Sequence, residues 1–504
     1  MLRSIALAAL LLLAGCRGAQ RDPQTVVFLI ESSPANLDPR IGTDAQSQRI
    51  DALMFDGLVD HNAAFQFTPA LAISWEQPSP LTFVFHLHSG VRFHDGRPFT
   101  AKDVKWTVDS MRDGTVISAK STVFASVDSV EVRDPLTVVF HLKHADNFLL
   151  RNLATGATGI VPEGSGRDFW KHPVGTGPFR FVSQQIDQDV VIERNSESWS
   201  TTPKLDRVRF AIVPDTITES LELEKGSGDV AVNSLPLDSL PVLAQRSNLK
   251  VEVTPGTEIQ YLAFNLRDPL LADARVRQGI ACAIDRDLII KTVLLGYAKP
   301  SVSLLPDSHW AWTGDVARYD FNPVRAEQLL DAAGHPRSRD GVRFHMTMKT
   351  SNDQGTRLLA AVLQQQFAKV GIALDLRSFE FATFYSDVTR GAFQMYSLRW
   401  VGGNEQPDIF GYNFLASNFS PKGANRTHYS NARLDTLLTD ANENPDTTAR
   451  RRDYVEAQQI LAGELPAFNL WYLNTIVVHS RRLSNVEPSA SGDYGFLRTA
   501  ELTN

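Results

Sequence analysis

Hydrophobic and polar positions alternate with a period of two along residues 83–88, which is the pattern of a strand with one buried face. Turn dipeptides follow at residues 89–90 and 95–96. Thr100 then fits a helix N-cap, with Asp103 three residues later as in a capping box, and apolar residues recur after it at helical spacing. The segment therefore predicts strand, turn, short strand, turn and helix.

Strands and helices alternate along the rest of the chain as well. Residues 25–30 form an apolar, β-rich run, and two further strands are predicted on either side of the Asp134-Pro135 turn. The second half predicts three helices, each followed by an extended segment, at residues 273–296, 322–334 and 358–371. This alternation predicts a mixed α/β chain built in layers.

Two glycines mark a sharp bend at residues 173–179. We expect Gly175 and Gly177 to use positive φ angles there, and Pro178 to fix the direction in which the chain leaves. The spacing is not that of a phosphate-binding loop. The bend is therefore interpreted as a structural turn.

Length, composition and charge set the class of protein. The chain has 504 residues, too many for one ordinary core, and predicts two or three domains. A hydrophobic content of 43% and a charged content of 21% are typical of a soluble globular protein. The formal net charge is -7, and no basic face is evident, so nucleic-acid binding has no support.

The N-terminus has the pattern of an export signal. Arg3 precedes an apolar run at residues 5–14, which is much shorter than the roughly 20 residues needed to cross a bilayer. The run ends in Leu13-Ala14-Gly15-Cys16, which resembles a lipobox. That resemblance implies removal of residues 1–15 as a signal peptide and a lipid on Cys16. An ordinary signal peptide with an incidental cysteine is the alternative.

The chain has 2 cysteines, so a lipid on Cys16 would leave no partner for an intrachain disulfide. Cys282 lies in the apolar run 279–284 and is predicted to be a small buried hydrophobic residue, with no role as a nucleophile. Residues 16–24 would form a short tether between the lipid and the folded protein.

Several motifs, taken in order, resemble the bacterial extracellular solute-binding proteins of the peptide/nickel (oligopeptide-binding) family. Each motif is weak alone, but their succession over roughly residues 25–485 is specific. The resemblance implies capture of a ligand without chemistry and its delivery to an ABC importer. The motifs lie at residues 83–108, 175–179, 261–286, 325–334 and 429–466.

The family resemblance implies a two-lobed periplasmic-binding-protein type II fold with an extra inserted domain, of mixed α/β (α+β) class. Two chain crossings, near 260–265 and 473–478, would form a hinge, and ligands favour such clefts between lobes. The ranges carried over are 25–49, 172–260 and 475–504 for lobe I, 50–171 for the inserted domain, and 261–474 for lobe II.

The ligand is expected to meet the segment around Trp400, where relatives place an aromatic residue facing the cleft. Burial of Trp400 in the lobe core is the alternative. Peptide-binding relatives carry an aspartate three residues after this tryptophan, and this chain has Gly403 there. Glu405 is the candidate replacement for that carboxylate, and Gly403, Asn404 and, beside Trp400, Arg399 are further candidate ligand contacts. An ammonium group without such a partner would be costly to bury.

The anchor for a ligand carboxylate is also altered. Dipeptide-binding relatives use an arginine after the strand at 343–348, where this chain has Thr350 with Lys349 beside it. Short peptides therefore lose support, and longer peptides or a non-peptide solute stay open. The remaining candidate ligand contacts are Pro34 and Ala35 in lobe I and, near the crossings, Tyr261 and Tyr472, for which hinge packing is the alternative.

Other classes of function find little in the sequence. His86, His88 and His94 suggest a metal site, but no cysteine or carboxylate cluster completes it. No serine-hydrolase elbow or zinc-protease motif is present, so no catalytic residue or cofactor is predicted, and a secreted hydrolase is the weakest alternative. A sensor or co-receptor of the same fold that does not transport remains open.

The sequence predicts a monomeric receptor in the periplasm or cell envelope, anchored to a membrane by the lipid on Cys16. It would close around a peptide or similar small solute and then dock on the permease subunits of an ABC importer. The identity of the solute does not follow from the sequence.

Overall fold

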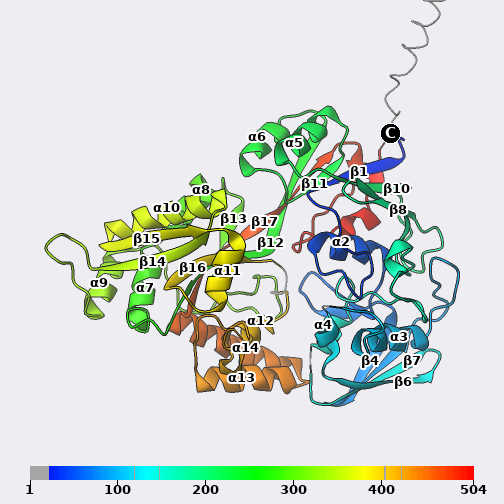
Figure 1. Cartoon of the computed structure of the whole chain (residues 1–504), viewed down its shortest axis with the longest axis horizontal. Helices are drawn as coiled ribbons and strands as arrows, with labels where there is room; N and C mark the ends of the chain where they lie inside the picture. Colours follow the sequence, from blue (N-terminus) through cyan, green and yellow to red (C-terminus); the bar gives the residue numbers. More distant parts are fainter. Residues whose placement is uncertain (1–21, 119, 147, 402–404, 422, 504) are drawn as a thin grey trace, which may run out of the picture.

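The computed structural model describes residues 22–118, 120–146, 148–401, 405–421 and 423–503, and has two lobes joined by long strands (Figure 1). In these ranges an 11-stranded sheet runs through both lobes in the order β15-β14-β16-β12-β17-β11-β1-β10-β9-β8, with β13 paired to β17. Its strands are β1 (Thr25–Ile30), β8 (Phe179–Gln185), β9 (Asp189–Arg194), β10 (Arg207–Ile212), β11 (Val230–Val232), β12 (Leu249–Phe264), β13 (Ala298–Pro300), β14 (Phe344–Ser351), β15 (Ile372–Phe379), β16 (Met395–Trp400) and β17 (Ala467–Ser480).

The antiparallel pair β12–β17 joins the lobes. Its register shifts between Pro255 and Ile259, opposite Tyr472 and Asn474, and again between Gln260 and Tyr261. Gly256 lies in this irregular stretch, so close to the carbonyl oxygen of Leu473 that a Cβ atom there would overlap it. The predicted crossings fall on these same two strands, and the irregular stretch is where the pair can bend.

Lobe I is built around β1, a strand that is buried on both faces. Its alternate residues enter two separate cores: Phe28 packs towards α2 and the C-terminal segment, and Leu29 packs towards α5 and α6. Such two-sided burial is typical of parallel strands, and β1 pairs in parallel with both β10 and β11. The surrounding elements are α2 (Ala45–Met54), α5 (Thr216–Lys225), η3 (Leu237–Ser239), α6 (Leu240–Ala244), β18 (Leu483–Ser484), η5 (Gly495–Arg498) and β19 (Glu501–Leu502).

The inserted domain is a four-stranded antiparallel sheet, β4-β5-β7-β6, covered by α3 (Figure 1). The predicted capping box is confirmed, because the Thr100 side chain accepts from the N–H of Lys102 and Asp103 accepts from that of Thr100. The elements of this domain and its flanks are β2 (Val59–His61), β3 (Phe67–Pro69), β4 (Ala72–Ser79), β5 (Thr82–Leu87), α3 (Ala101–Arg112), η1 (Ser121–Phe124), β6 (Val127–Asp134), β7 (Thr137–Leu142), α4 (Leu149–Asn152) and η2 (Phe169–Lys171).

Lobe II corrects one prediction, because the single helix expected at 273–296 is two helices. The N–H of Asp285 donates to the Gln366 side chain at 2.9 Å, and the Asp285 carboxylate caps the second helix through the N–H of Leu288. Both bonds compete with a continuous helix. The lobe II helices are α7 (Ala274–Cys282), α8 (Arg286–Thr292), α9 (Pro323–Ala332), α10 (Gln354–Lys369), α11 (Phe381–Thr389), α12 (Ile409–Phe414), η4 (Ala416–Asn418), α13 (Ala432–Glu443) and α14 (Thr447–Glu464).

The bend at residues 173–179 is a structural turn, but its glycines serve a different purpose from the one expected. Neither Gly175 nor Gly177 has a φ angle in the left-handed region. Instead, a Cβ atom on either would overlap the backbone of Met54, against which the turn packs. His94 fastens the turn by accepting from the N–H of Gly175 at 3.1 Å, which gives this histidine a structural role.

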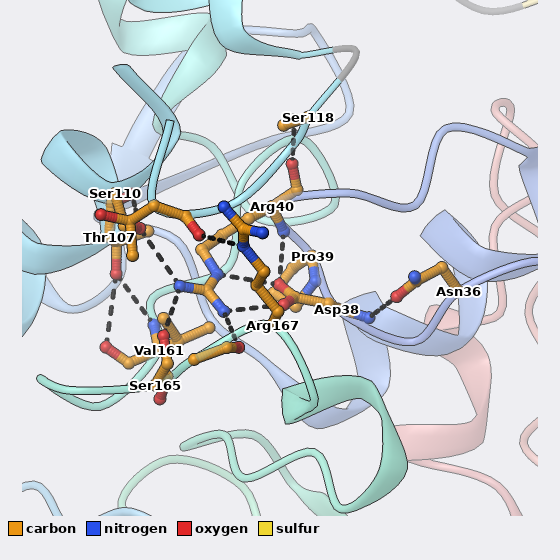
Figure 2. A network of polar contacts seen from close by, with 12 residues as sticks. Asn36, Asp38, Pro39, Arg40, Thr107, Ser110, Ser118, Val161, Ser165 and Arg167 are labelled. Carbon is orange, nitrogen blue, oxygen red and sulfur yellow. Dashed lines mark hydrogen bonds and ion pairs between the residues drawn. The ribbon is translucent and has the colours of Figure 1, made fainter. Parts of the chain in front are cut away.

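A buried ion pair connects lobe I with the inserted domain (Figure 2). The guanidinium of Arg40 donates from Nε and Nη2 to the two carboxylate oxygens of Asp38, at 3.0 and 2.7 Å, and both side chains are fully buried. Nη1 donates to Ser110 Oγ on α3 and to the carbonyl of Ser165, and Nη2 also donates to the carbonyl of Gly166. Each N–H bond of the guanidinium thus has an acceptor.

Candidate functional site

A cavity of about 1290 Å³ lies where lobe I, the inserted domain and lobe II meet. It is larger than the roughly 300–1,000 Å³ of ordinary small-molecule pockets. Its wall comes from distant parts of the chain: α2 and the C-terminal segment 488–498, the β2–β3 hairpin with residues 151–157, the irregular stretch of β12–β17, and, from lobe II, the segment 299–318 with Val401, Glu405 and Gln406.

The tip of the β2–β3 hairpin reaches across to lobe II at the rim of this cavity. Phe65 is buried and holds a positive φ of 60°, and its ring stacks on that of His309 with 5.7 Å between centroids. The carbonyl of Ala64 accepts from the N–H of Trp310 at 3.3 Å, and that of Phe65 accepts from Gln406 Nε2 at 3.5 Å. We call these contacts the rim contact; they hold the inserted domain against lobe II.

An ion pair closes the same side of the cavity. Arg151 Nη1 of the inserted domain lies 2.5 Å from Asp408 Oδ2 of lobe II. Burial raises the pKa of Asp408 to about 6, although Arg151 acts in the opposite direction. The second carboxylate oxygen of Asp408 is buried without a hydrogen-bond partner among the described residues. The pair therefore connects the inserted domain with lobe II, and one of the two Asp408 oxygens lacks a hydrogen bond within the described residues.

Four acidic side chains line the cavity, Asp60, Asp307, Glu405 and Asp493, and burial acts on the last two. Burial raises the pKa of Glu405, whose carboxylate accepts from Thr257 Oγ1 at 3.4 Å. Burial also opposes ionisation of Asp493, but hydrogen bonds from Ser491, Ser489 and the backbone N–H of Gly495 hold its pKa below the ordinary value. Asp493 is thus kept ionised in the wall, which suits a cationic group of a ligand.

Two of the predicted ligand contacts belong to this wall, Glu405 and Tyr472. The hydroxyl of Tyr472 donates to the carbonyl of Ser303 at 3.0 Å, so its ring edge is fixed. Gly403, Asn404 and Cys16 lie outside the described residues.

Trp400 stands at the end of β16, beside the cavity. Its half-buried indole stacks on Tyr261 with 6.4 Å between centroids, and the guanidinium of Arg426 lies 5.6 Å above it. The next residue, Val401, lines the cavity, whereas Trp400 and Tyr261 are not among the described residues of that wall. A ligand contact of either ring stays a prediction.

The other predicted contacts are engaged elsewhere in the part of the chain that the structure describes. Lys349 forms an ion pair with Asp387 at 2.7 Å, and exposed Arg399 lies 3.7 Å from Glu258. Buried Pro34 accepts from Gln184, and the N–H of Ala35 donates to Asp44. Their roles in binding also stay predictions, and these bonds would have to yield to a ligand.

Sequence reasoning missed most of the charged wall. His61, Arg151 and Asp493 come from three separate regions, and Arg49 and Arg498 come from α2 and η5. None of them stands in a motif of its own. The signal that could have pointed to Arg49 is its place at the predicted boundary between lobe I and the inserted domain.

Metal ligation and membrane crossing find no basis in the described residues. No group of three or more His, Cys, Asp or Glu side chains there could hold a metal ion. His86 and His141 instead lie beside the carboxylates of Glu76 and Glu131, and Cys282 is buried, with the pKa of its thiol raised by that burial. None of the described helices combines the length and hydropathy that a membrane span requires.

Comparison with known proteins gives a consistent result. Residues 66–422 match the sequence profile of the family described as "Bacterial extracellular solute-binding proteins, family 5 Middle". The dipeptide-binding protein of Escherichia coli is 25% identical over 498 residues, covering 93% of this chain and 92% of its own. The same fold is found in CtaP, an ABC transporter substrate-binding protein of Listeria monocytogenes, with a TM-score of 0.85 and 24% identity over 95% of this chain and 99% of that one. It is also found in DppA of Helicobacter pylori in complex with the peptide STSA, with a TM-score of 0.75 and 25% identity over 95% and 98%.

Proposed function

Because the chain belongs to the bacterial extracellular solute-binding proteins, family 5, we propose that it captures a peptide or similar small solute between its lobes and delivers it unaltered to an ABC importer. The observation that carries the proposal is the cavity of about 1290 Å³, whose wall combines both lobes and the inserted domain. A solute that touches all three favours the closed arrangement and shifts the population of conformers towards it.

A peptide suits this wall better than a neutral solute does. The related Escherichia coli protein is named for dipeptides, and the Helicobacter pylori structure holds a tetrapeptide. Peptide-binding relatives have an aspartate at the position of Gly403. In this chain Glu405 and Asp493 offer carboxylates to an ammonium group instead. The volume leaves room for more than two residues, and the backbone of an extended peptide can be held by strand-like hydrogen bonds.

The test is mass spectrometry of the purified protein under conditions that keep it folded. A bound peptide with an unchanged covalent structure supports the proposal. A co-purified solute that leaves with altered bonds would instead indicate an enzyme. Uptake measurements in a strain without this protein then separate import from sensing, because a co-receptor that does not transport leaves uptake intact.

We further propose that the protein is held in the cell envelope by a lipid on Cys16. The support is the apolar run at residues 5–14 followed by Leu13-Ala14-Gly15-Cys16. Cells grown with a labelled fatty acid are expected to label the native protein and not the Cys16→Ser variant. Equal label in both would contradict the anchor and leave solute capture untouched.

Trp400→Ala is expected to weaken solute binding by about 1–3 kcal/mol, as for a buried aromatic contact. The reason is that Trp400 is half-buried and directly precedes Val401 in the cavity wall. Calorimetric titration with the solute found by mass spectrometry measures the effect. Tyr412→Ala is the control, because this exposed ring lies 6.0 Å from Trp400 without being part of the described wall. Unchanged affinity would place Trp400 in the lobe core.

A further inference from the structure

We propose that Arg49 and Arg498 form a binding site for a carboxylate group of the solute, on the lobe I wall of the cavity. The inference rests on the proposed capture of a solute in this cavity and adds a chemical requirement to it. The solute must carry an anionic group, and a peptide with neutral side chains must have a free carboxyl terminus.

The two arginines belong to the same wall of the cavity, at α2. Arg49 and Ala52 are three residues apart on this helix and both line the cavity, so they share one face. Arg498 comes from the end of η5 and donates from Nη2 to the carbonyl of Ala52 at 2.7 Å. The guanidinium of Arg498 is therefore held against α2, on the wall that Arg49 also lines.

Neither arginine is neutralised by the protein. Within the part of the chain that the structure describes, no carboxylate lies within 4.0 Å of either guanidinium. Two other cations of the wall are paired, Arg151 with Asp408 and Lys299 with Asp307. Arg318, on the lobe II side, also has no carboxylate partner but has no second arginine beside it in the wall. Two of the three arginines of the described wall that have no carboxylate partner thus lie on lobe I.

The donors of the pair are held in place and only partly used. The Arg49 guanidinium lies 5.6 Å from the ring centroid of Tyr494, which orients it without supplying a negative charge. Arg498 donates from Nη2 to the carbonyl of Ala52, and its Nη1 has no acceptor among the described residues. A carboxylate can accept from two such planar groups at once, and charge-assisted hydrogen bonds of this kind are the stronger ones.

The opposite sign of charge is present on the same cavity. Asp493 is ionised and Glu405 faces it from lobe II, so a solute with both an ammonium and a carboxylate finds a partner for each. Closure removes water from these contacts, and an ion that lacks a partner there becomes costly. The pair of arginines therefore selects against solutes whose acidic group is blocked.

The test is competitive retention of three tripeptide pools by the purified protein, read by mass spectrometry. The first pool has neutral side chains and free carboxyl termini, the second is the same set as carboxyl-terminal amides, and the third is amides that contain glutamate. We expect the wild-type protein to retain the free acids at least about tenfold over the neutral amides. Retention of the third pool as well assigns the site to any carboxylate, and its loss assigns it to the terminal one; both support the site.

Arg498→Gln and the double variant Arg49→Gln/Arg498→Gln are expected to lose the preference for acids. Arg452→Gln removes the same charge from an exposed position on α14 and is expected to keep it. Equal retention of acids and neutral amides by the wild-type protein overturns the anion site and leaves solute capture untouched. A preference for acids that survives in the double variant does the same. Retention of no pool at all overturns the capture of peptides itself.

Discussion

Arg40→Leu is expected to lower the free energy of unfolding by about 3–5 kcal/mol, because it leaves the Asp38 carboxylate charged and buried. Both side chains are fully buried and meet through two hydrogen bonds, at 3.0 and 2.7 Å. The change also removes donors from the carbonyls of Ser165 and Gly166 and from Ser110 on α3 (Figure 2). The contact between lobe I and the inserted domain is therefore the part that weakens.

The chain contains a matched control for this change. Arg97 and Asp95 have the same spacing as Arg40 and Asp38 and form an ion pair of the same length, 2.7 Å, but their side chains are 54% and 34% exposed. Arg97→Leu should cost less than about 1 kcal/mol, as surface ion pairs do. Urea unfolding followed by fluorescence compares the two variants. A loss for Arg40→Leu no larger than that for Arg97→Leu would show that burial adds nothing to the pair.

Local patterns predicted the elements of the fold well where one interaction decides the outcome. The capping box at Thr100 and Asp103 depends on two side chains and their own backbone, so the sequence alone suffices. The break between α7 and α8 depends on Gln366, far along the chain, which takes the N–H of Asp285. The role of Gly175 likewise depends on Met54, which packs against it only in the folded chain.

The candidate site was less predictable for the same reason. Glu405 and Tyr472 were found because the family resemblance pointed to the segments that hold them. Arg49, Arg151 and Asp493 meet around one cavity only after three regions of the chain have been brought together. Their residue types are common on surfaces, so neither composition nor spacing distinguishes them before the fold is known.

Closure of the lobes is expected to become more favourable as the pH falls from 7.5 towards 4, through Asp408. In this structure, where Arg151 meets Asp408, burial raises the pKa of this carboxyl to about 6, whereas its ordinary value is 3.8. Once the lobes separate, Arg151 and the inserted domain no longer cover it, and we expect the ordinary value to return. The closed form then binds the proton more tightly, so its advantage is complete below 3.8 and is lost as the pH rises through 6.

The difference between these pKa values corresponds to about 3 kcal/mol at most. The Asp408→Asn side chain is neutral at every pH, so this variant is expected to keep the advantage of the closed form throughout. Its closure should then vary less with pH than that of the wild type. Arg151→Gln is expected to disfavour closure at pH 7.5 by about 2–4 kcal/mol, because the Asp408 charge then stays buried without its partner. Small-angle scattering across this pH range measures closure as a smaller radius of gyration, with and without solute.

Other groups at the rim contact titrate in the same range, so the decisive quantity is the difference between wild type and Asp408→Asn. Burial lowers the pKa of His309 to about 4, so the rim contact is favoured at higher pH. This pH dependence is opposite to the one that Asp408 gives to closure. Asp387→Asn is the control, since its ion pair with Lys349 lies within lobe II alone. If wild type and Asp408→Asn close with the same pH profile, Asp408 does not couple protons to the hinge, and the Arg151 pair is only a static contact between the lobes.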